Sequence, residues 1–419
     1  MEDDEGAMKA KDNREYVPRS MGRKVEELSR FYPCVLLTGA RQVGKSTLLR
    51  HMLPEGMTYL TLDDYQLAEY AQSDPMGFLD AYPAPLCIDE IQYAPQLFRA
   101  IKMKVDADRR PGMYWMTGSQ RFHMMKGVSD SLAGRIGIVD LYSLAQRELY
   151  GDADGGVYTP EQPDEAVCEK SLCGLRELYE RIWRGGYPAL HRDPDLPAYD
   201  FFRDYVQTYA ERDVRSLTQV GDLEAFVKLM RSAAMRSGQQ LVYSDLARDA
   251  GVSPKTAAAW ISILQASGIV ELLEPYHVNT TKRLAKTPKL YFCDTGLCCW
   301  LAGWRSAEQL MEGPFSGAIL ETWVYGQLMR RYANAGIKPA MTYYRDLDGA
   351  EVDFVLELNG GVYPLEVKRS SAPMESDLRW CRKIPVPSWA ELKAPVVFCT
   401  SEKARPMPHG AWAFPISGL

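Results

Sequence analysis

The stretch GARQVGKSTLLR at residues 39–50 follows the apolar run PCVLL and decides the fold of the region around it. It fits the pattern GxxxxGK(S/T) at Gly39, Gly44, Lys45 and Ser46. An apolar strand enters this loop and a helix, STLLRHML, leaves it. Backbone N–H groups can then wrap phosphates at the positive end of the helix. A chance glycine turn would need neither flanking element, so the sequence predicts a nucleotide-binding loop.

The polar side chains of this loop have expected roles. Lys45 would reach the β and γ phosphates of ATP, and the Ser46 hydroxyl would bind Mg²⁺ with Thr47 beside it. ATP and Mg²⁺ are therefore the expected cofactors. The residues expected to contact the nucleotide are Gly39, Gln42, Val43, Gly44, Lys45, Ser46 and Thr47.

Two later apolar runs end in polar residues that suit the same site. In PLCIDEIQ, Asp89 stands at a strand end where it can hold Mg²⁺, and Glu90 is suited to polarise the attacking water. Solvated acids after a buried strand are the alternative, which loses weight beside a phosphate loop. In YWMTGSQ, Ser119 or Thr117 could contact the γ phosphate or the water, and a purely structural role explains them equally well.

Arg135, in SLAGRIG, is the expected source of a positive charge that stabilises the transition state. It could act in its own chain or from a neighbouring one. A surface arginine without a role in the site is the alternative.

The segment around these motifs alternates short apolar runs with helical stretches. This pattern predicts an α/β fold with a mostly parallel sheet and helices on both faces. We place this domain at residues 15–170, ending in the acidic, Gly- and Pro-rich loop 151–170. Residues 171–222 look helical and rich in aromatic residues.

Residues 223–294 have the pattern of a winged helix-turn-helix, with Ser253 and Pro254 starting the second helix. Basic residues cluster in the proposed wing, where they would contact DNA phosphates without sequence choice. Ala258 and Ala259 face outward where a base reader would need a polar side chain. The alternative is a winged helix that packs on other domains. The basic residues of the proposed wing are Lys282, Arg283, Lys286 and Lys289.

The segment from 295 to 419 is expected to be a mixed α/β domain built around a hairpin. Asn359-Gly360 is a strong two-residue turn signal, and it pairs Leu358 with Gly361. Counting outward from this turn, Asp353 lies opposite Glu366.

On this hairpin, Asp353, Glu366 and Lys368 share one face. Two opposed carboxylates can share a divalent cation, with the lysine holding a phosphate or an activated water. The alternative is a solvent-facing strand pair in which Glu351 and Lys368 form a cross-strand ion pair. Like charges directly opposite repel each other, which disfavours that alternative.

Composition limits the remaining possibilities. The chain of 419 residues has a net charge of −6, so any nucleic-acid contact must be a local patch. Its nine cysteines include no CxxC pair, which favours reduced thiols over disulfides or zinc. No apolar run approaches the ~20 residues that cross a bilayer. We expect a cytoplasmic protein without membrane contact and a disordered tail at residues 1–14.

The segments LLTGARQVGKSTLL, CIDEIQ, MTGSQRF and SLAGRI resemble prokaryotic AAA-superfamily ATPases that end in a domain of unknown function. That domain is related to restriction-endonuclease-like folds. The Asp353…Glu366-x-Lys368 pattern resembles the PD-(D/E)xK nuclease core, in which an upstream helix often supplies another carboxylate, here Glu321. The resemblance implies ATP binding on an AAA-like core, a winged helix and a nuclease-like C-terminal domain. Ring assembly, common among AAA-like proteins, makes a homo-oligomer a further option.

Two functional hypotheses follow. The first is a Mg-dependent ATPase that couples its nucleotide state to a DNA-acting, nuclease-like C-terminal domain. In that domain Glu321, Asp353 and Glu366 would bind metal, and Asp353, Glu366 and Lys368 would be catalytic. The alternative is an ATP-dependent switch whose inactive C-terminal domain binds a protein partner.

Overall fold

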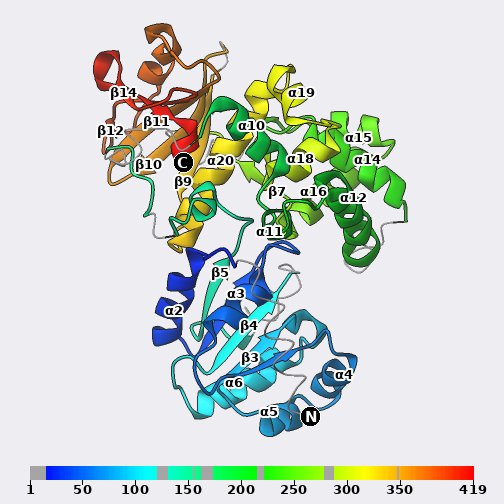
Figure 1. Cartoon of the computed structure of the whole chain (residues 1–419). Coiled ribbons are helices and arrows are strands. Elements are labelled where there is room, and N and C mark those ends of the chain that lie inside the picture. Colours follow the sequence, from blue (N-terminus) through cyan, green and yellow to red (C-terminus); the bar gives the residue numbers. More distant parts are fainter. Residues whose placement is uncertain are drawn as a thin grey trace.

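The computed structural model describes residues 16–119, 131–153, 156–161, 173–214, 221–277, 287–346 and 349–419, apart from the side chains of residues 212 and 213. The expected tail at residues 1–14 lies outside these ranges. Figure 1 shows an amino-terminal α/β body below and two bodies side by side above it. We call them the nucleotide body, with elements from residue 21 to 149, the middle body, with elements from 175 to 312, and the C-terminal body, with elements from 316 to 418.

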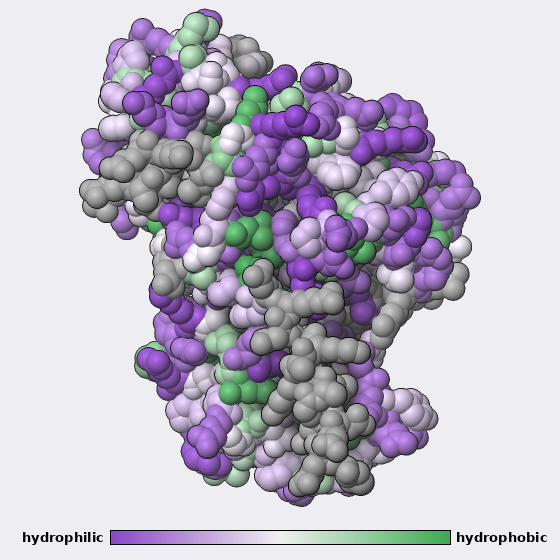
Figure 2. Space-filling model, in the orientation of Figure 1, coloured by the Kyte–Doolittle hydropathy of each residue, from purple (hydrophilic) through white to green (hydrophobic). Residues whose placement is uncertain are grey.

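The molecular face in Figure 2 is mostly hydrophilic, with small hydrophobic patches scattered over it. Within the described ranges, no helix has both the length and the apolar character that a bilayer crossing requires.

The nucleotide body is built on a five-stranded parallel sheet with strand order β2-β3-β4-β1-β5, which confirms the predicted parallel α/β core. Both faces of this sheet are covered, because Val35 and Leu37 belong to one apolar cluster while Cys34 and Leu36 belong to another. Its strands are β1 (Cys34–Thr38), β2 (Thr58–Thr61), β3 (Leu86–Asp89), β4 (Tyr114–Gly118) and β5 (Ile136–Asp140).

Helices α2 and α3 contribute to one of these clusters, and α4, α5 and α6 contribute to the other. Parallel strands all end at the same edge of the sheet, so residues after β1, β3 and β4 meet there. The helices are α2 (Met21–Phe31), α3 (Lys45–Met52), α4 (Tyr65–Ser73), α5 (Pro75–Ala81), α6 (Leu97–Ala107) and α8 (Gln146–Leu149), with the 3₁₀ turn η1 (Ile91–Tyr93).

The middle body is mainly helical, with a small sheet of order β6-β8-β7. Ser253 caps α16, whose first residue is Pro254, as the sequence predicts. The proposed wing residues Lys282, Arg283 and Lys286 lie outside the described ranges. The elements are α10 (Leu175–Arg184), α11 (Pro188–Arg192), α12 (Ala198–Thr208), the π-helix η2 (Tyr209–Val214), α14 (Leu223–Ala234), β6 (Gln239–Gln240), α15 (Tyr243–Ala250), α16 (Pro254–Ala266), β7 (Val270–Leu273), β8 (Lys289–Phe292), α18 (Thr295–Leu301) and α19 (Ala307–Glu312).

The C-terminal body packs the long helix α20 against a mixed sheet of order β14-β15-β13-β11-β10-β9, with β12 beside β11. Its elements are α20 (Ser316–Asn334), β9 (Ala340–Arg345), β10 (Glu351–Leu358), β11 (Gly361–Lys368), β12 (Glu391–Leu392), β13 (Val396–Cys399), β14 (Arg405–Pro406), β15 (Trp412–Pro415) and the 3₁₀ turns η3 (Glu375–Leu378), η4 (Cys381–Lys383), η5 (Pro408–Gly410) and η6 (Ile416–Gly418).

The predicted hairpin register is confirmed from Leu358 opposite Gly361 to Phe354 opposite Leu365. Asn359 and Gly360 have φ values of 50° and 78°, as a tight two-residue turn requires.

A buried polar junction joins the three bodies. Ser143, just after β5, donates from Oγ to Asp294 Oδ2 over 2.8 Å, and the Gly186 N–H reaches the same oxygen at 2.9 Å. Arg330 of α20 donates to the Ser143 carbonyl at 3.0 Å and to the Cys293 carbonyl at 2.8 Å. Because buried polar groups need partners, these contacts restrain how the bodies sit against one another.

Candidate functional site

The phosphate loop depends on two glycines. Gly39 has a φ of 145°, and a Cβ there would lie 2.2 Å from the Leu141 carbonyl oxygen. Gly44 has a φ of 95° and is the N-cap of α3. Side chains other than hydrogen fit neither position well, which explains both glycines of the motif.

Lys45 begins α3, and its side chain bends back over the loop. Its Nζ donates to the carbonyl oxygens of Gly39 at 3.0 Å and Ala40 at 2.8 Å. The residue is only 5% exposed. The ammonium group is thus fixed directly above the loop that the sequence predicts to hold phosphates.

Asp89, at the end of β3, accepts hydrogen bonds from three hydroxyl groups. Ser46 Oγ donates to its Oδ1 at 2.8 Å, Tyr59 OH donates to its Oδ2 at 2.7 Å, and Thr117 Oγ1 also donates to Oδ1. Burial, followed by the hydrogen bond to Asp89, raises the pKa of Tyr59 above its ordinary value. Sequence reasoning paired Ser46 with Asp89 but missed Tyr59, whose position depends on strand order.

Glu90 follows Asp89 in a left-handed conformation, with a φ of 57°. Its carboxylate accepts a hydrogen bond from Ser119 Oγ at 3.0 Å and another from Gln92 Nε2. Its backbone N–H donates to Thr117 Oγ1 at 3.0 Å. A strained backbone held by several partners is typical of a functional position. The structure thus brings Glu90 and Ser119 together, as the sequence suggests.

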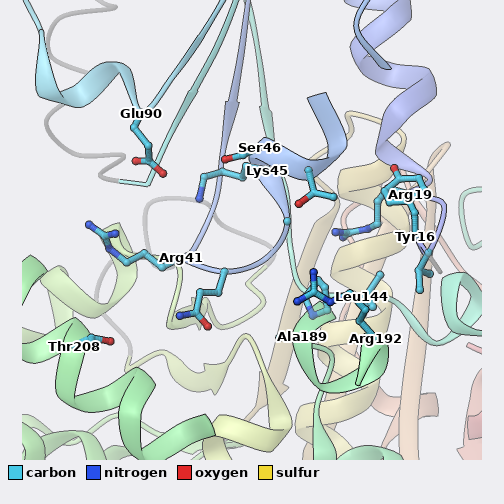
Figure 3. Close-up of a pocket in the computed structure, with 15 residues that line it drawn as sticks. Tyr16, Arg19, Arg41, Lys45, Ser46, Glu90, Leu144, Ala189, Arg192 and Thr208 are labelled. Carbon is cyan, nitrogen blue, oxygen red and sulfur yellow. The ribbon is translucent and has the colours of Figure 1, made fainter. Parts of the chain in front are cut away.

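A pocket of about 510 Å³ opens over the loop, within the size range of small-molecule sites. The nucleotide body forms one wall, and the middle body supplies Pro188, Ala189, Arg192 and Thr208. In Figure 3, Lys45 and Ser46 lie between Glu90 on one side and Arg19, Tyr16 and Arg192 on the other. The loop residues that line the pocket are Arg41, Gln42, Gly44, Lys45, Ser46 and Thr47.

Val43 points away from this pocket. Its side chain is 2% exposed within the apolar core, and its carbonyl accepts a hydrogen bond from Arg19 Nη1 at 2.8 Å. Val43 therefore does not line the pocket over the loop.

The prediction that Arg135 serves the nucleotide of its own chain is wrong. The Arg135 carbonyl bonds to the N–H of Cys34, the first residue of β1, whereas the phosphate loop follows the last residue of β1. Five strand residues separate these edges by about 16 Å. The guanidinium group donates from Nε to Asp106 at 2.6 Å and from Nη1 to the Ala133 carbonyl at 3.1 Å.

The C-terminal body gathers the predicted carboxylates into a second cluster. Val367 donates its N–H to Asp353 Oδ2 at 2.8 Å, and Lys368 Nζ donates to Glu366 Oε2 at 2.6 Å. Burial and the Asp353 carboxylate raise the pKa of Glu321 to about 7. Burial and then Asp353 also raise the pKa of Glu366. The cluster therefore includes Glu321, Asp353, Glu366 and Lys368, as the sequence predicts.

The expected direct opposition of Asp353 and Glu366 is not part of the strand ladder. The β10–β11 pairing ends at Phe354 and Leu365. On its other side, the pairing of β10 with β9 has a register shift between Val352 and Val355. The Asp353 carboxylate instead accepts a hydrogen bond from the backbone N–H of Val367.

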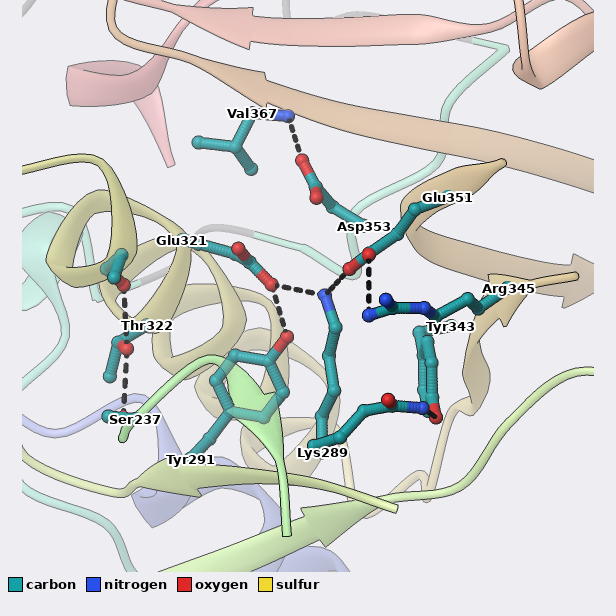
Figure 4. A network of polar contacts seen from close by, with 12 residues as sticks. Ser237, Lys289, Tyr291, Glu321, Thr322, Tyr343, Arg345, Glu351, Asp353 and Val367 are labelled. Carbon is teal, nitrogen blue, oxygen red and sulfur yellow. Dashed lines mark hydrogen bonds and ion pairs between the residues drawn. The ribbon is translucent and has the colours of Figure 1, made fainter. Parts of the chain in front are cut away.

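The position of Lys289 contradicts its proposed contact with DNA. It is 2% exposed, and its Nζ lies 2.9 Å from Glu321 Oε1 and 2.6 Å from Glu351 Oε1 (Figure 4). A buried, paired ammonium cannot reach a DNA phosphate. Glu351 pairs with Lys289 and with Arg345 at 3.2 Å, and Lys368 pairs with Glu366. The alternative interpretation, a cross-strand ion pair between Glu351 and Lys368, therefore does not match the observed pairs.

The two sites differ in how well they suit a divalent cation. Ser46 and Asp89 offer a hydroxyl and a carboxylate at the phosphate loop, a donor set that suits Mg²⁺ bound with phosphates. In the C-terminal cluster, lysines and an N–H group already engage the carboxylates. Across the ranges that the structure describes, no group of three or more His, Cys, Asp or Glu residues is arranged to hold a metal ion. The predicted metal site at Glu321, Asp353 and Glu366 does not fit as it stands.

Comparison with known proteins adds three family matches. Residues 32–150 match an AAA domain, residues 175–308 match a domain of unknown function (DUF8612), and residues 316–419 match another domain of unknown function (DUF4143).

The uncharacterized proteins Rv2008c of Mycobacterium tuberculosis and Mb2031c of Mycobacterium bovis are each 31% identical to this chain over 347 residues. These alignments cover 81% of this chain and 71% of each relative. Among solved structures, the Walker-type ATPase PABY2304 of Pyrococcus abyssi matches 67% of this chain and 94% of its own, at 16% identity and a TM-score of 0.40.

Proposed function

This chain belongs to the same family as the two mycobacterial proteins and contains a P-loop AAA-type ATPase domain, and we propose that it is a Mg²⁺-dependent ATPase acting as a nucleotide-driven switch. The observation that carries this proposal is the 2.8 Å contact between Ser46 and Asp89, beside Lys45 and Glu90 at one pocket.

The pocket over the loop would bind ATP with its phosphates along the N-terminus of α3. Lys45 would then exchange its two carbonyl partners for phosphate oxygens, and Arg41 and Arg192 would add positive charge from opposite walls. Ser46 and Asp89 would hold Mg²⁺, which supplies charge neutralisation at the phosphates.

Glu90 would orient and deprotonate the attacking water. Its carboxylate lies at the pocket, where hydrogen bonds from Ser119 and Gln92 set its direction. A positioned general base of this kind typically contributes 10²–10⁴ in rate.

ATP binding and hydrolysis would change how the three bodies contact one another. Arg192 and Thr208 of the middle body line the nucleotide pocket, so bound ATP would contact both bodies. The junction through Ser143 and Arg330 extends from the end of β5 to α20, which also carries Glu321. The sequence suggests domain limits of 15–170, 171–222, 223–294 and 295–419. Because α18 and α19 pack mainly on helices of the middle body, we propose that the last domain begins at α20, near residue 316, and that it binds a protein partner.

ATP binding and turnover by the full chain test this proposal. Wild-type protein should bind a fluorescent ATP analogue and release phosphate only with Mg²⁺, and Lys45→Ala should lose both activities. The matched control is Lys338→Ala, which removes an exposed lysine far along the chain. Wild-type binding retained in Lys45→Ala would rule out this pocket as the ATP site.

A second candidate, a DNA-acting nuclease-like C-terminal domain, is favoured by the convergence of Asp353, Glu366 and Lys368. Its test is cleavage of single-stranded, duplex and branched DNA with Mg²⁺ or Mn²⁺, comparing wild type with Asp353→Ala and Lys368→Ala. Cleavage that both variants lose would favour the nuclease. No cleavage, with equal DNA affinity in all three proteins, would favour the switch.

A further inference from the structure

The predicted metal site and the observed contacts disagree, and this disagreement concerns Lys289. We propose that Lys289 is the built-in counter-ion of the C-terminal carboxylate cluster and occupies the place where a divalent cation would otherwise bind. The proposal refines the switch function, because it makes the C-terminal body a site that excludes metal as folded.

The geometry around the ammonium group is that of a filled cation site. Carboxylates from two elements, Glu321 of α20 and Glu351 of β10, approach the same Nζ at 2.9 and 2.6 Å. In Figure 4, the ammonium group lies between these two carboxylates, with Asp353 next to them. Such oxygens from separate elements are also the ligands that Mg²⁺ or Mn²⁺ would recruit.

The lysine is held in this position by its surroundings. Lys289 pairs with Gln240 of β6 and Leu273 of β7, so its backbone is fixed on both sides. The ammonium lies 5.3 Å from the centre of the Tyr343 ring. Tyr291 OH donates to the same Glu321 oxygen that Lys289 contacts. A flexible surface lysine would show none of these restraints.

Charge balance explains why the chain places a lysine here. Buried carboxylates are costly unless a positive charge or a proton compensates them. Lys289 neutralises Glu321 and, together with Arg345, Glu351, while Lys368 neutralises Glu366. A divalent cation would have to displace the ammonium group, which is covalently attached and cannot diffuse away.

The experiment measures Mn²⁺ binding to the nucleotide-free full chain by calorimetry, together with thermal unfolding with and without Mn²⁺. The proteins are wild type, Asp353→Asn, Lys289→Arg, Lys289→Met and the double variant Lys289→Met with Glu321→Gln, which removes one of the two carboxylates that contact the ammonium group. All five share the same phosphate loop, so an ion bound there is common to all and cancels from the comparison.

Wild type, Asp353→Asn and Lys289→Arg should give the same Mn²⁺ isotherm. Lys289→Met should gain one additional site that binds at least roughly ten-fold tighter than anything wild type shows there, because the freed carboxylates regain a cation. Its unfolding temperature should fall below that of wild type and recover with Mn²⁺. The double variant should lose the gained site.

A wild-type Mn²⁺ site that Asp353→Asn removes would overturn the proposal and favour the metal-dependent nuclease instead. A folded Lys289→Met without additional Mn²⁺ binding would overturn it too. So would a Lys289→Met that remains unfolded even with Mn²⁺, because the ion should replace the missing charge. Since the nucleotide site is not measured, failure of the ATPase proposal would leave these outcomes unchanged.

Discussion

The Ser46 hydroxyl lies 2.8 Å from Oδ1 of Asp89, and this contact joins the first turn of α3 to the end of β3. Strand β4 lies between β3 and β1 in the sheet, so the two residues meet only because parallel strands end at one edge. The site therefore depends on the correct sheet order, and the first prediction concerns this pair.

Asp89→Asn should preserve the fold but weaken Mg-ATP binding. The amide oxygen can still accept the hydrogen bond from Ser46, and the amide NH₂ can donate to the Tyr59 oxygen, but the side chain has no charge to offer a metal ion. We expect a loss of about 1.5–3 kcal/mol, or roughly 10- to 150-fold in affinity, with Mg²⁺ present and little change without it. Titration of an ATP analogue with and without Mg²⁺ measures this. Exposed Asp108 supplies the control, Asp108→Asn. An equal loss under both conditions would contradict the metal role.

Gly39→Ala should abolish nucleotide binding, because its Cβ would meet the Leu141 carbonyl oxygen at 2.2 Å. Gly56→Ala is the matched control: its φ of 81° is also left-handed, but no atom lies within 4 Å of its Cβ position. Strain alone should cost the control about 1–2 kcal/mol of stability without affecting ATP binding. Chemical denaturation and ATP titration separate the two effects. ATP affinity lowered equally in both variants would mean that the steric contact is irrelevant.

Arg192→Ala should weaken ATP binding by roughly ten-fold or more, because Arg192 brings a cation to the pocket from the middle body. Arg135→Ala should leave ATP affinity unchanged in the monomer, because Arg135 lies at the opposite edge of the sheet and pairs with Asp106. Calorimetric titration at low protein concentration compares the two. The reverse ranking would show that the nucleotide binds elsewhere.

Arg330→Gln should uncouple the nucleotide body from the C-terminal body. It removes the donors to Ser143 and Cys293 but touches no residue of the pocket. Hydrogen exchange should show that ATP changes protection of β10 and β11 in wild type but not in this variant. Arg331→Gln, whose parent side chain bonds to the Gly156 carbonyl instead, should retain the response. An ATP response that persists in Arg330→Gln would exclude this junction as the connection.

Local sequence patterns were sufficient to predict the phosphate loop, the parallel sheet and the central part of the hairpin register. These features follow from neighbouring residues: glycines at fixed spacing, apolar runs, and the Asn359-Gly360 turn. The same turn could not reveal the register shift near Val352, because that shift arises from pairing with β9, another part of the chain.

The remaining differences arise from long-range contacts. In the sequence, Lys289 looks like a residue of the wing. Its ion pairs with Glu321 of α20 and Glu351 of β10 depend on long-range packing, which only the structure shows. Tyr59 likewise reaches Asp89 only because β2 lies next to β3. Arg135 was predictable in principle, since a residue that precedes a parallel strand lies at the edge opposite the phosphate loop.

The most direct test of the ATPase assignment is a single-turnover measurement of ATP hydrolysis with Mg²⁺ by wild type and Glu90→Gln, with bound nucleotide identified after separation. Glu90→Gln should bind ATP as wild type does and hydrolyse it about 10²–10⁴ times more slowly, so that ATP remains on the protein. Hydrolysis at the wild-type rate in Glu90→Gln would contradict the account.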